Sequence, residues 1–136
     1  MRGLMIGVCS LVAGAGVLAT GCSPVVKAHG RQGTVEATYA RRTLSATLPA
    51  SARVPAVIAA AEETVRARGY SVERSTATEE VGVLVARPPR TTDFPVITID
   101  ADLMPGATRV RLTVSPFGDQ EMSRSILDGT LQRLGL

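Results

Sequence analysis

The chain has 136 residues, of which 45% are hydrophobic and 20% are charged, and it contains no tryptophan, two tyrosines and two phenylalanines. Fifteen basic and twelve acidic residues give it a formal net charge of +3. This length suits one domain and excludes a multidomain enzyme, and the share of hydrophobic residues excludes a wholly disordered chain.

The first twenty residues have the pattern of an export signal. Arg2 is the only charged residue before Lys27, and residues 3–20 form an uncharged, largely apolar stretch. A basic start followed by a short apolar segment is typical of a signal peptide. A permanent membrane helix needs about 20 apolar residues, and this stretch is shorter and interrupted by three glycines. We therefore expect the rest of the chain to be exported.

The apolar stretch ends in Leu18-Ala19-Thr20-Gly21-Cys22-Ser23. This segment resembles the lipobox of bacterial lipoproteins, in which small residues lead to a glycine and then a cysteine, although Ala19 stands where the motif prefers leucine. The resemblance implies cleavage before Cys22, a diacylglycerol thioether on its sulfur and an acylated new amino terminus. The alternative, an incidental thiol after ordinary cleavage, would leave Cys22 without a disulfide partner, because the only other cysteine, Cys9, is removed.

A lipid on Cys22 would make the bilayer the first partner of the chain. Each buried CH₂ contributes about 0.8 kcal/mol, so several acyl chains together anchor firmly. In the sorting rule of Gram-negative lipoproteins, aspartate directly after the cysteine retains the protein in the inner membrane. Ser23 at that position implies an outer-membrane anchor facing the periplasm, and a Gram-positive source would change the membrane but not the anchor.

The expected organisation is a signal peptide over residues 1–21, a lipidated tether over residues 22–38 and a single domain over residues 39–136. The tether is polar and contains the only histidine, His29, which has no partner at metal-ligand spacing, so we expect no metal and no cofactor. Without residues 1–21 the chain keeps 14 basic and 12 acidic residues, scattered and with only four aromatics, which argues against a nucleic-acid partner.

The first half of the domain predicts one strand, a helix and two further strands. Residues 43–48 alternate as a half-buried strand, and Pro49 ends it. A helix follows, with Ser51 as its cap, Pro55 in its first turn and Gly69 as a left-handed C-cap. Its buried stripe is Val54, Val57, Ile58, Ala61 and Val65. Residues 70–74 predict a second strand, and residues 81–86, which are apolar on both faces, predict an interior strand.

The second half predicts a hairpin centred on Pro105-Gly106 and a closing helix. The hairpin register pairs Ala101 with Val110, Ile99 with Leu112 and Ile97 with Val114. It also sets Asp102 opposite Arg109 and Asp100 opposite Arg111, which we interpret as surface ion pairs rather than a metal or phosphate motif.

In the closing helix we expect Gly118 at the N-cap, Glu121 in a capping box and a staple between Phe117 and Met122. The buried stripe predicted for this helix is Met122, Ile126, Leu127, Leu131 and Leu134.

These elements, in the order β-α-β-β-β-β-α, predict an α+β two-layer sandwich with two helices on one face of an antiparallel sheet of four or five strands. The second face of the sheet would then be free for a partner. Gly82, Leu84 and Ala86 are the candidate contact residues on that face, and the alternative is that a loop or the tether covers them.

Three short segments, Phe117-Gly118-Asp119, Ser123-Arg124 and Ile126-Leu127-Asp128, resemble the closing signature of a family of small bacterial lipoproteins of unknown function. The segments 39–48, 69–72 and 110–134 also fit this family. The chain departs from it in the loop at 90–94 and at Gly129-Thr130, where the family has better helix formers. The resemblance implies a lipoprotein with an α+β fold and no known reaction.

An enzyme needs reactive groups that converge, and one histidine in the tether with one acylated cysteine does not supply them. We therefore expect a membrane-anchored envelope lipoprotein that acts as a non-catalytic binding or structural module with an envelope protein as partner. The alternatives are an accessory factor in envelope assembly or lipid handling and, at lower weight, a small hydrolase-like enzyme.

Overall fold

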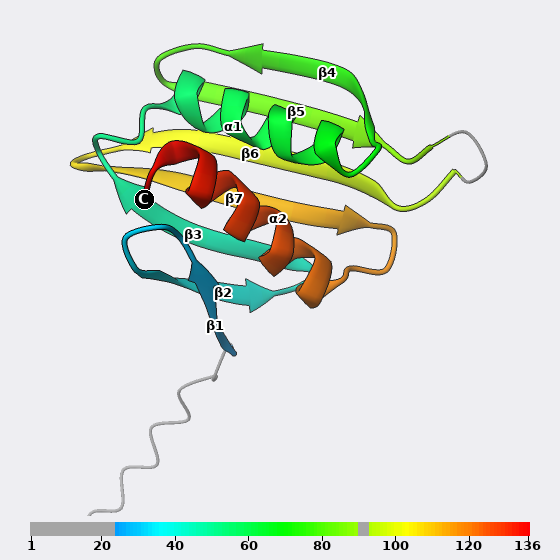
Figure 1. Ribbon diagram of the computed structural model, residues 1–136, viewed down its shortest axis with the longest axis horizontal. Helices are drawn as coiled ribbons and strands as arrows, with labels where there is room; N and C mark the ends of the chain where they lie inside the picture. The colour runs from blue at the N-terminus through cyan, green and yellow to red at the C-terminus, as the bar shows by residue number, and fades with distance from the viewer. Residues whose placement is uncertain (1–23, 90–92) are drawn as a thin grey trace, which may run out of the picture.

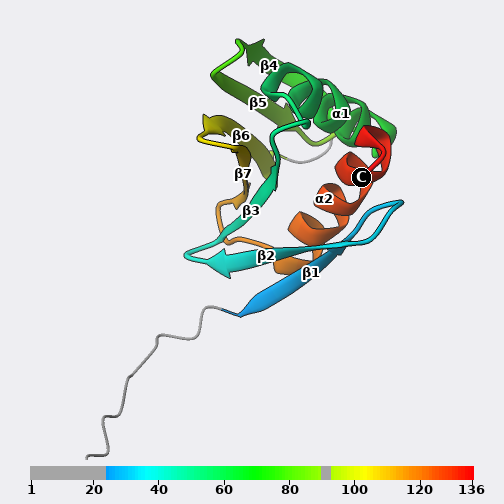
Figure 2. The ribbon, with the colours of Figure 1, turned by 90° about the vertical axis from the view of Figure 1, so that its left-hand side faces the viewer.

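The computed structural model describes residues 24–89 and 93–136, so the signal segment and Cys22 lie outside the described residues. One antiparallel sheet holds seven strands in the order β1-β2-β3-β7-β6-β5-β4. Two helices pack on one face of this sheet (Figures 1 and 2). The elements, in chain order, are β1 (Val25–His29), β2 (Thr34–Ala40), β3 (Thr43–Pro49), α1 (Val54–Ala67), β4 (Ser71–Ala77), β5 (Val81–Arg87), β6 (Val96–Met104), β7 (Ala107–Ser115) and α2 (Gln120–Leu134).

The predicted α+β class and the two helices on one face are confirmed, but the sheet has seven strands. The prediction of a tether over residues 22–38 is wrong for its described part, because residues 25–29 and 34–38 are paired strands. Val26, Ala28 and Ala37 are buried in the core. The backbone N–H of His29 donates to a carboxylate oxygen of Asp128 in α2 at 2.6 Å. Residues 25–38 are therefore part of the folded domain.

Each helix covers one half of the sheet. Helix α1 contacts β4, β5 and β6, while α2 contacts β1, β3 and β7. The predicted buried stripe of α1 is confirmed, with Val54 and Val57 fully buried. The N-cap is Arg53, without a side-chain cap bond, rather than Ser51. The C-cap is Arg68 rather than Gly69, but Gly69, the next residue, has the predicted left-handed conformation with φ +85°.

The interior position of β5 is confirmed, but the proposed partner face on it is wrong. Gly82, Leu84 and Ala86 are buried on the face that α1 covers, and a Cβ on Gly82 would collide with the Ile58 side chain. The glycine therefore lets α1 approach the strand closely. On the opposite face of β5, the face without helices, lie Val81, Val83 and Val85, which are half-buried or exposed.

The predicted hairpin register is confirmed at every position named above, with Pro105-Gly106 as its two-residue turn. The ion pairs differ in part from the prediction. Asp102 contacts both Arg109, at 3.4 Å, and Arg111, at 3.0 Å. Arg111 reaches diagonally across the strand pair to Asp102. Asp100 is thus opposite Arg111 in the strand register, as predicted, but the ion pair of Arg111 is with Asp102.

The buried stripe of α2 is confirmed, with Ile126, Leu127 and Leu131 in the core and Met122 and Leu134 packed at its border. The predicted start of this helix is wrong. Asp119 is the N-cap, and its carboxylate accepts a hydrogen bond from the N–H of Met122 at 2.9 Å. Phe117 is 86% exposed, so it forms no hydrophobic staple.

Candidate functional site

Three segments far apart in the sequence meet where the described chain begins. The backbone N–H of Tyr39 donates to the carbonyl of Pro24 at 3.2 Å, and a guanidinium N–H of Arg42 donates to the carbonyl of Pro116 at 2.6 Å. We call the surface formed by Pro24, Arg41, Arg42, Pro116 and Phe117 the N-terminal corner. In Figures 1 and 2 the start of β1, the β2–β3 turn and the start of α2 lie at this part of the molecule.

The turn in this corner has an energetically unfavourable backbone conformation. Arg41 and Arg42 connect β2 to β3 and have φ values of +49° and +69°. Two successive positive φ values are the pattern of a type I′ hairpin turn, where Asn-Gly or Asp-Gly is strongly preferred. A left-handed backbone costs an ordinary residue roughly 1–2 kcal/mol. Two arginines therefore occupy positions that other residues would fill at lower cost.

The segment after β7 presents Phe117 to solvent. Gly118 has φ +77°, and a Cβ there would lie 2.6 Å from the Tyr39 hydroxyl and 2.8 Å from Cβ of Arg42. The segment is thus fixed against the β2–β3 turn by close packing and by the Arg42–Pro116 hydrogen bond. Three residues of the closing signature have structural roles, since Gly118 makes this close approach, Asp119 caps α2 and Asp128 accepts a hydrogen bond from β1. Phe117 has no comparable packing role.

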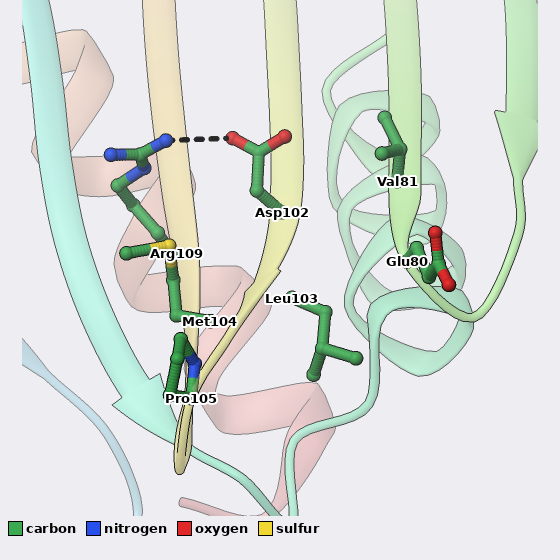
Figure 3. Close-up of a pocket in the computed structure, with 7 residues that line it drawn as sticks. All are labelled: Glu80, Val81, Asp102, Leu103, Met104, Pro105 and Arg109. Carbon is green, nitrogen blue, oxygen red and sulfur yellow. Dashed lines mark hydrogen bonds and ion pairs between the residues drawn. The ribbon is translucent and has the colours of Figure 1, made fainter.

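A second feature lies at the opposite end of the sheet. An open hollow of about 550 Å³ is lined by Glu80, Val81, Asp102, Leu103, Met104, Pro105 and Arg109. Figure 3 shows these side chains around the ends of β5, β6 and β7. Val81 and Leu103 are each 50% exposed, so one wall of the hollow is apolar.

The polar part of the hollow is formed by ion-paired side chains. Asp102 lies between Arg109 and Arg111, and Figure 3 shows its contact with Arg109. Nε of Arg109 is buried and has no hydrogen-bond partner among the described residues. The Arg109 side chain as a whole is 41% exposed, so the hollow presents a positive charge beside its apolar wall.

Among the described residues, His29 does not lie near the aspartates of β6. His29 is exposed at the end of edge strand β1, far along the sheet from Asp100 and Asp102. Within residues 24–89 and 93–136, no group of three or more His, Cys, Asp or Glu side chains is placed to hold a metal ion. No helix in those ranges has the length and hydropathy of a membrane span.

Perturbed ionisable groups lie in exposed ion pairs. In the first turn of α2 a hydrogen bond from Arg124 lowers the pKa of Glu121. The same contact raises the pKa of Arg124, as Glu79 and Glu73 raise the pKa of Arg53 and Arg87 by hydrogen bonding. None of these groups belongs to the hollow or to the N-terminal corner.

The sequence profile of DUF3568, a family of proteins of unknown function, matches residues 4–132. The chain belongs to the DUF3568 family. No curated protein matches it. The family assignment of this DUF3568 protein carries no activity.

The sequence interpretation of this DUF3568 protein missed both surface features. The hollow depends on where β5, β6 and β7 end relative to one another, which no local pattern gives. The N-terminal corner carried one readable signal, because an Arg-Arg pair between two alternating segments could have indicated a short hairpin turn.

Proposed function

We propose that the protein is an envelope lipoprotein, anchored by acyl chains on Cys22, that acts as a non-catalytic binding or structural module. The observation that carries the proposal is the position of Cys22 at the end of an uncharged segment, in the sequence Leu-Ala-Thr-Gly-Cys. The family match begins at residue 4, so this segment lies inside the matched region. Ser23 after the cysteine favours the outer membrane, facing the periplasm.

The structure of the domain agrees with this proposal. The first strand starts at Val25, so Cys22 lies only a few residues before a fully folded domain. The other reactive side chain, His29, sits on an exposed edge strand and serves there through its backbone N–H. The carboxylate of Asp102 already forms ion pairs with Arg109 and Arg111. These features favour a binding role over catalysis.

Metabolic labelling with radioactive palmitate tests the anchor. The wild-type protein should carry label, Cys22→Ala should lose it, and Cys9→Ala, which removes the cysteine inside the signal segment, should keep it. Label that persists in Cys22→Ala, or that is absent from the wild type, would refute lipidation at this residue. Ser23→Asp tests the location separately, since it should move the labelled protein from the outer to the inner membrane fraction.

The hollow favours one second candidate, an accessory role in lipid handling. Leu103 and Met104 offer an apolar wall, and the Arg109 side chain, which is 41% exposed, offers a positive charge to a carboxylate or phosphate. A fluorescent fatty acid should then bind the domain and be displaced by unlabelled fatty acid. Leu103→Asp should abolish this binding while Leu103→Ala weakens it, and equal binding by all three proteins would eliminate the candidate.

A further inference from the structure

We propose that the N-terminal corner lies directly against the bilayer, with Phe117 inserted at the level of the lipid headgroups and Arg41 and Arg42 facing lipid phosphates. This inference rests on the proposed anchor at Cys22 and adds an orientation to it. It commits to one occupant of the corner, an anionic phospholipid surface.

Chain length limits how far the domain can lie from its anchor. Cys22 precedes Pro24 by two residues, and an extended chain spans at most about 3.6 Å per residue, so the two Cα atoms are within about 7 Å. The Pro24 carbonyl is itself hydrogen bonded to Tyr39, next to the β2–β3 turn. A lipid on Cys22 therefore brings this corner to the headgroup region, and a domain on so short a connection has little freedom to turn another face to the membrane.

Both phenylalanines of the chain lie in segments at the same end of the sheet. Phe117 is 86% exposed and follows the last residue of β7, while Phe94 is 60% exposed and precedes β6. The first residue of β6, Val96, pairs with the last residue of β7, Ser115, so the two aromatics leave the sheet at one end. A chain that keeps its only phenylalanines out of its core leaves them available for an apolar environment, and phenylalanine is a typical membrane-facing residue of interfacial segments.

Phe117 is held in a fixed position rather than left on a loose loop. Gly118 makes a close approach to Tyr39 and Arg42, and the Arg42 guanidinium donates to the Pro116 carbonyl. The exposed ring therefore projects from a rigid segment. Rigidity lowers the entropy lost when a side chain becomes ordered in a new environment.

The charges of the corner match an anionic surface. Arg41 and Arg42 are exposed on the two-residue β2–β3 turn, and both have positive φ. Asn-Gly would suit this backbone conformation better. Backbone strain retained in this way points to a use for the side chains. The nearest acidic groups along the chain after Phe117 are engaged, since Asp119 caps α2 and Glu121 pairs with Arg124. The corner therefore presents its positive charge outward.

Tryptophan fluorescence tests the orientation, because the chain has no tryptophan of its own. Residues 24–136 contain the whole sheet and both helices, so a chain of residues 22–136 folds independently of the signal segment. Cys22 is the only cysteine in it and can be coupled to a maleimide phospholipid in phosphatidylcholine–phosphatidylglycerol vesicles. The coupling supplies the anchor, so the result is independent of whether cells acylate Cys22.

The two variants to compare are Phe117→Trp and, as the control, Ala50→Trp, an exposed position just after β3 at the other end of the sheet and outside the lining of the hollow. Vesicles whose acyl chains carry bromine should shift the emission of Phe117→Trp to the blue and quench most of it. The same vesicles should leave Ala50→Trp with the emission of an indole in water. Equal quenching of both variants, or none in Phe117→Trp, would overturn the orientation and favour a protein partner for the exposed ring.

Charge at the corner has a separate test in the uncoupled chain with Cys22→Ser. Arg41→Asn should weaken binding to anionic vesicles about five-fold, the value for one charge near such a surface, whereas Arg31→Asn at the other end of the sheet should not. The asparagine suits the left-handed backbone, so the thermal midpoint should not fall. Equal affinities for Arg41→Asn and Arg31→Asn would contradict the assignment of Arg41 to the membrane surface.

Discussion

At the scale of single residues, glycines with a left-handed backbone separate into two kinds. Gly106 in the β6–β7 turn has φ +69°, and a Cβ there would meet no atom within 4 Å. Gly118 has φ +77°, and a Cβ there would also collide with Tyr39 and Arg42. The first glycine is required only by its backbone conformation, while the second is required by its conformation and by the packing of the N-terminal corner.

Alanine substitution should measure this difference. Gly106→Ala should lower the free energy of unfolding by about 1–2 kcal/mol, the cost of a left-handed alanine. Gly118→Ala should lower it by roughly 3 kcal/mol, because overpacking adds to that cost. Chemical denaturation of the two variants checks the prediction, and equal losses would show that the contacts of Gly118 with Tyr39 and Arg42 carry no energy.

The ion pair at the start of α2 predicts a local pH dependence. Arg124 lowers the pKa of Glu121 in the folded chain by hydrogen bonding. The pair therefore stabilises the fold above the pKa of an unfolded glutamate, and this stabilisation is lost as the pH falls through the lower, folded pKa. NMR titration should find the pKa of Glu121 below its ordinary value in the wild type and restored in Arg124→Gln. An unchanged pKa in that variant would contradict the assigned cause.

At the scale of elements, the two helices approach each other at Gly129, one of the positions where the chain departs from the resembling lipoproteins. A Cβ on Gly129 would lie 2.8 Å from the Cγ2 methyl of Thr64 in α1. The hydroxyl of Thr64 donates to the carbonyl of Ala60, which orients that methyl group. Glycine lowers the helix propensity at this position, but it allows α1 and α2 to pack closely over the sheet.

This explanation predicts the sign of a double substitution. Gly129→Ala alone should lower the thermal midpoint, because overpacking of roughly 1–3 kcal/mol exceeds a propensity gain of about 1 kcal/mol. In a Thr64→Ser background, which lacks the methyl group, Gly129→Ala should be neutral or stabilising. A rise in the thermal midpoint for Gly129→Ala in the unmodified chain would show that the methyl group of Thr64 does not exclude a side chain at position 129.

Edge strand β1 depends on α2 for one of its hydrogen bonds. The N–H of His29 donates to Asp128, so Asp128→Ala should speed the hydrogen exchange of the His29 amide, while Asp128→Asn keeps an acceptor and should preserve its protection. Exchange followed by NMR provides the comparison. Equal protection in the two variants would mean that pairing with β2 alone holds the strand.

Sequence patterns predicted the elements that have long apolar stripes and missed those that do not. Strands β3, β6 and β7 alternate with large side chains such as Leu44, Ile99 and Leu112, and their register followed from matching both faces. Strand β2 alternates as well, but its inward residues are Val35, Ala37 and Tyr39, of which only Ala37 is fully buried. The alternation of β2 is visible in the sequence, but it is a weak signal because β1 and β2 bury little apolar surface.

The face of β5 could not be predicted from its own residues. Residues 81–86 are apolar on both sides, so alternation does not say which side α1 covers. Gly82, Leu84 and Ala86 were assigned to the free face, yet α1 packs over them, because Gly82 and Ala86 are small enough to admit the helix. The decision depends on contact with Ile58 and Val54, which are more than twenty residues away in the chain.

At the scale of the whole molecule, the N-terminal corner and the hollow occupy opposite ends of one sheet. With the corner against the bilayer, the hollow would open away from the membrane, toward partners or ligands in the surrounding compartment. This arrangement suits a binding module better than a protein that draws lipid from its own anchoring bilayer. The end-to-end separation comes from the sheet topology and was not accessible to sequence patterns.

The proposed function requires that the exported chain begins at an acylated cysteine. Intact mass spectrometry of the protein extracted from membranes tests it most directly. Lipidation at Cys22 predicts a polypeptide of residues 22–136 whose mass is increased by a diacylglyceryl group and an amide-linked acyl chain, both located on Cys22 by fragmentation. A chain that starts at another residue, or that starts at Cys22 with an unmodified thiol and amine, would contradict it.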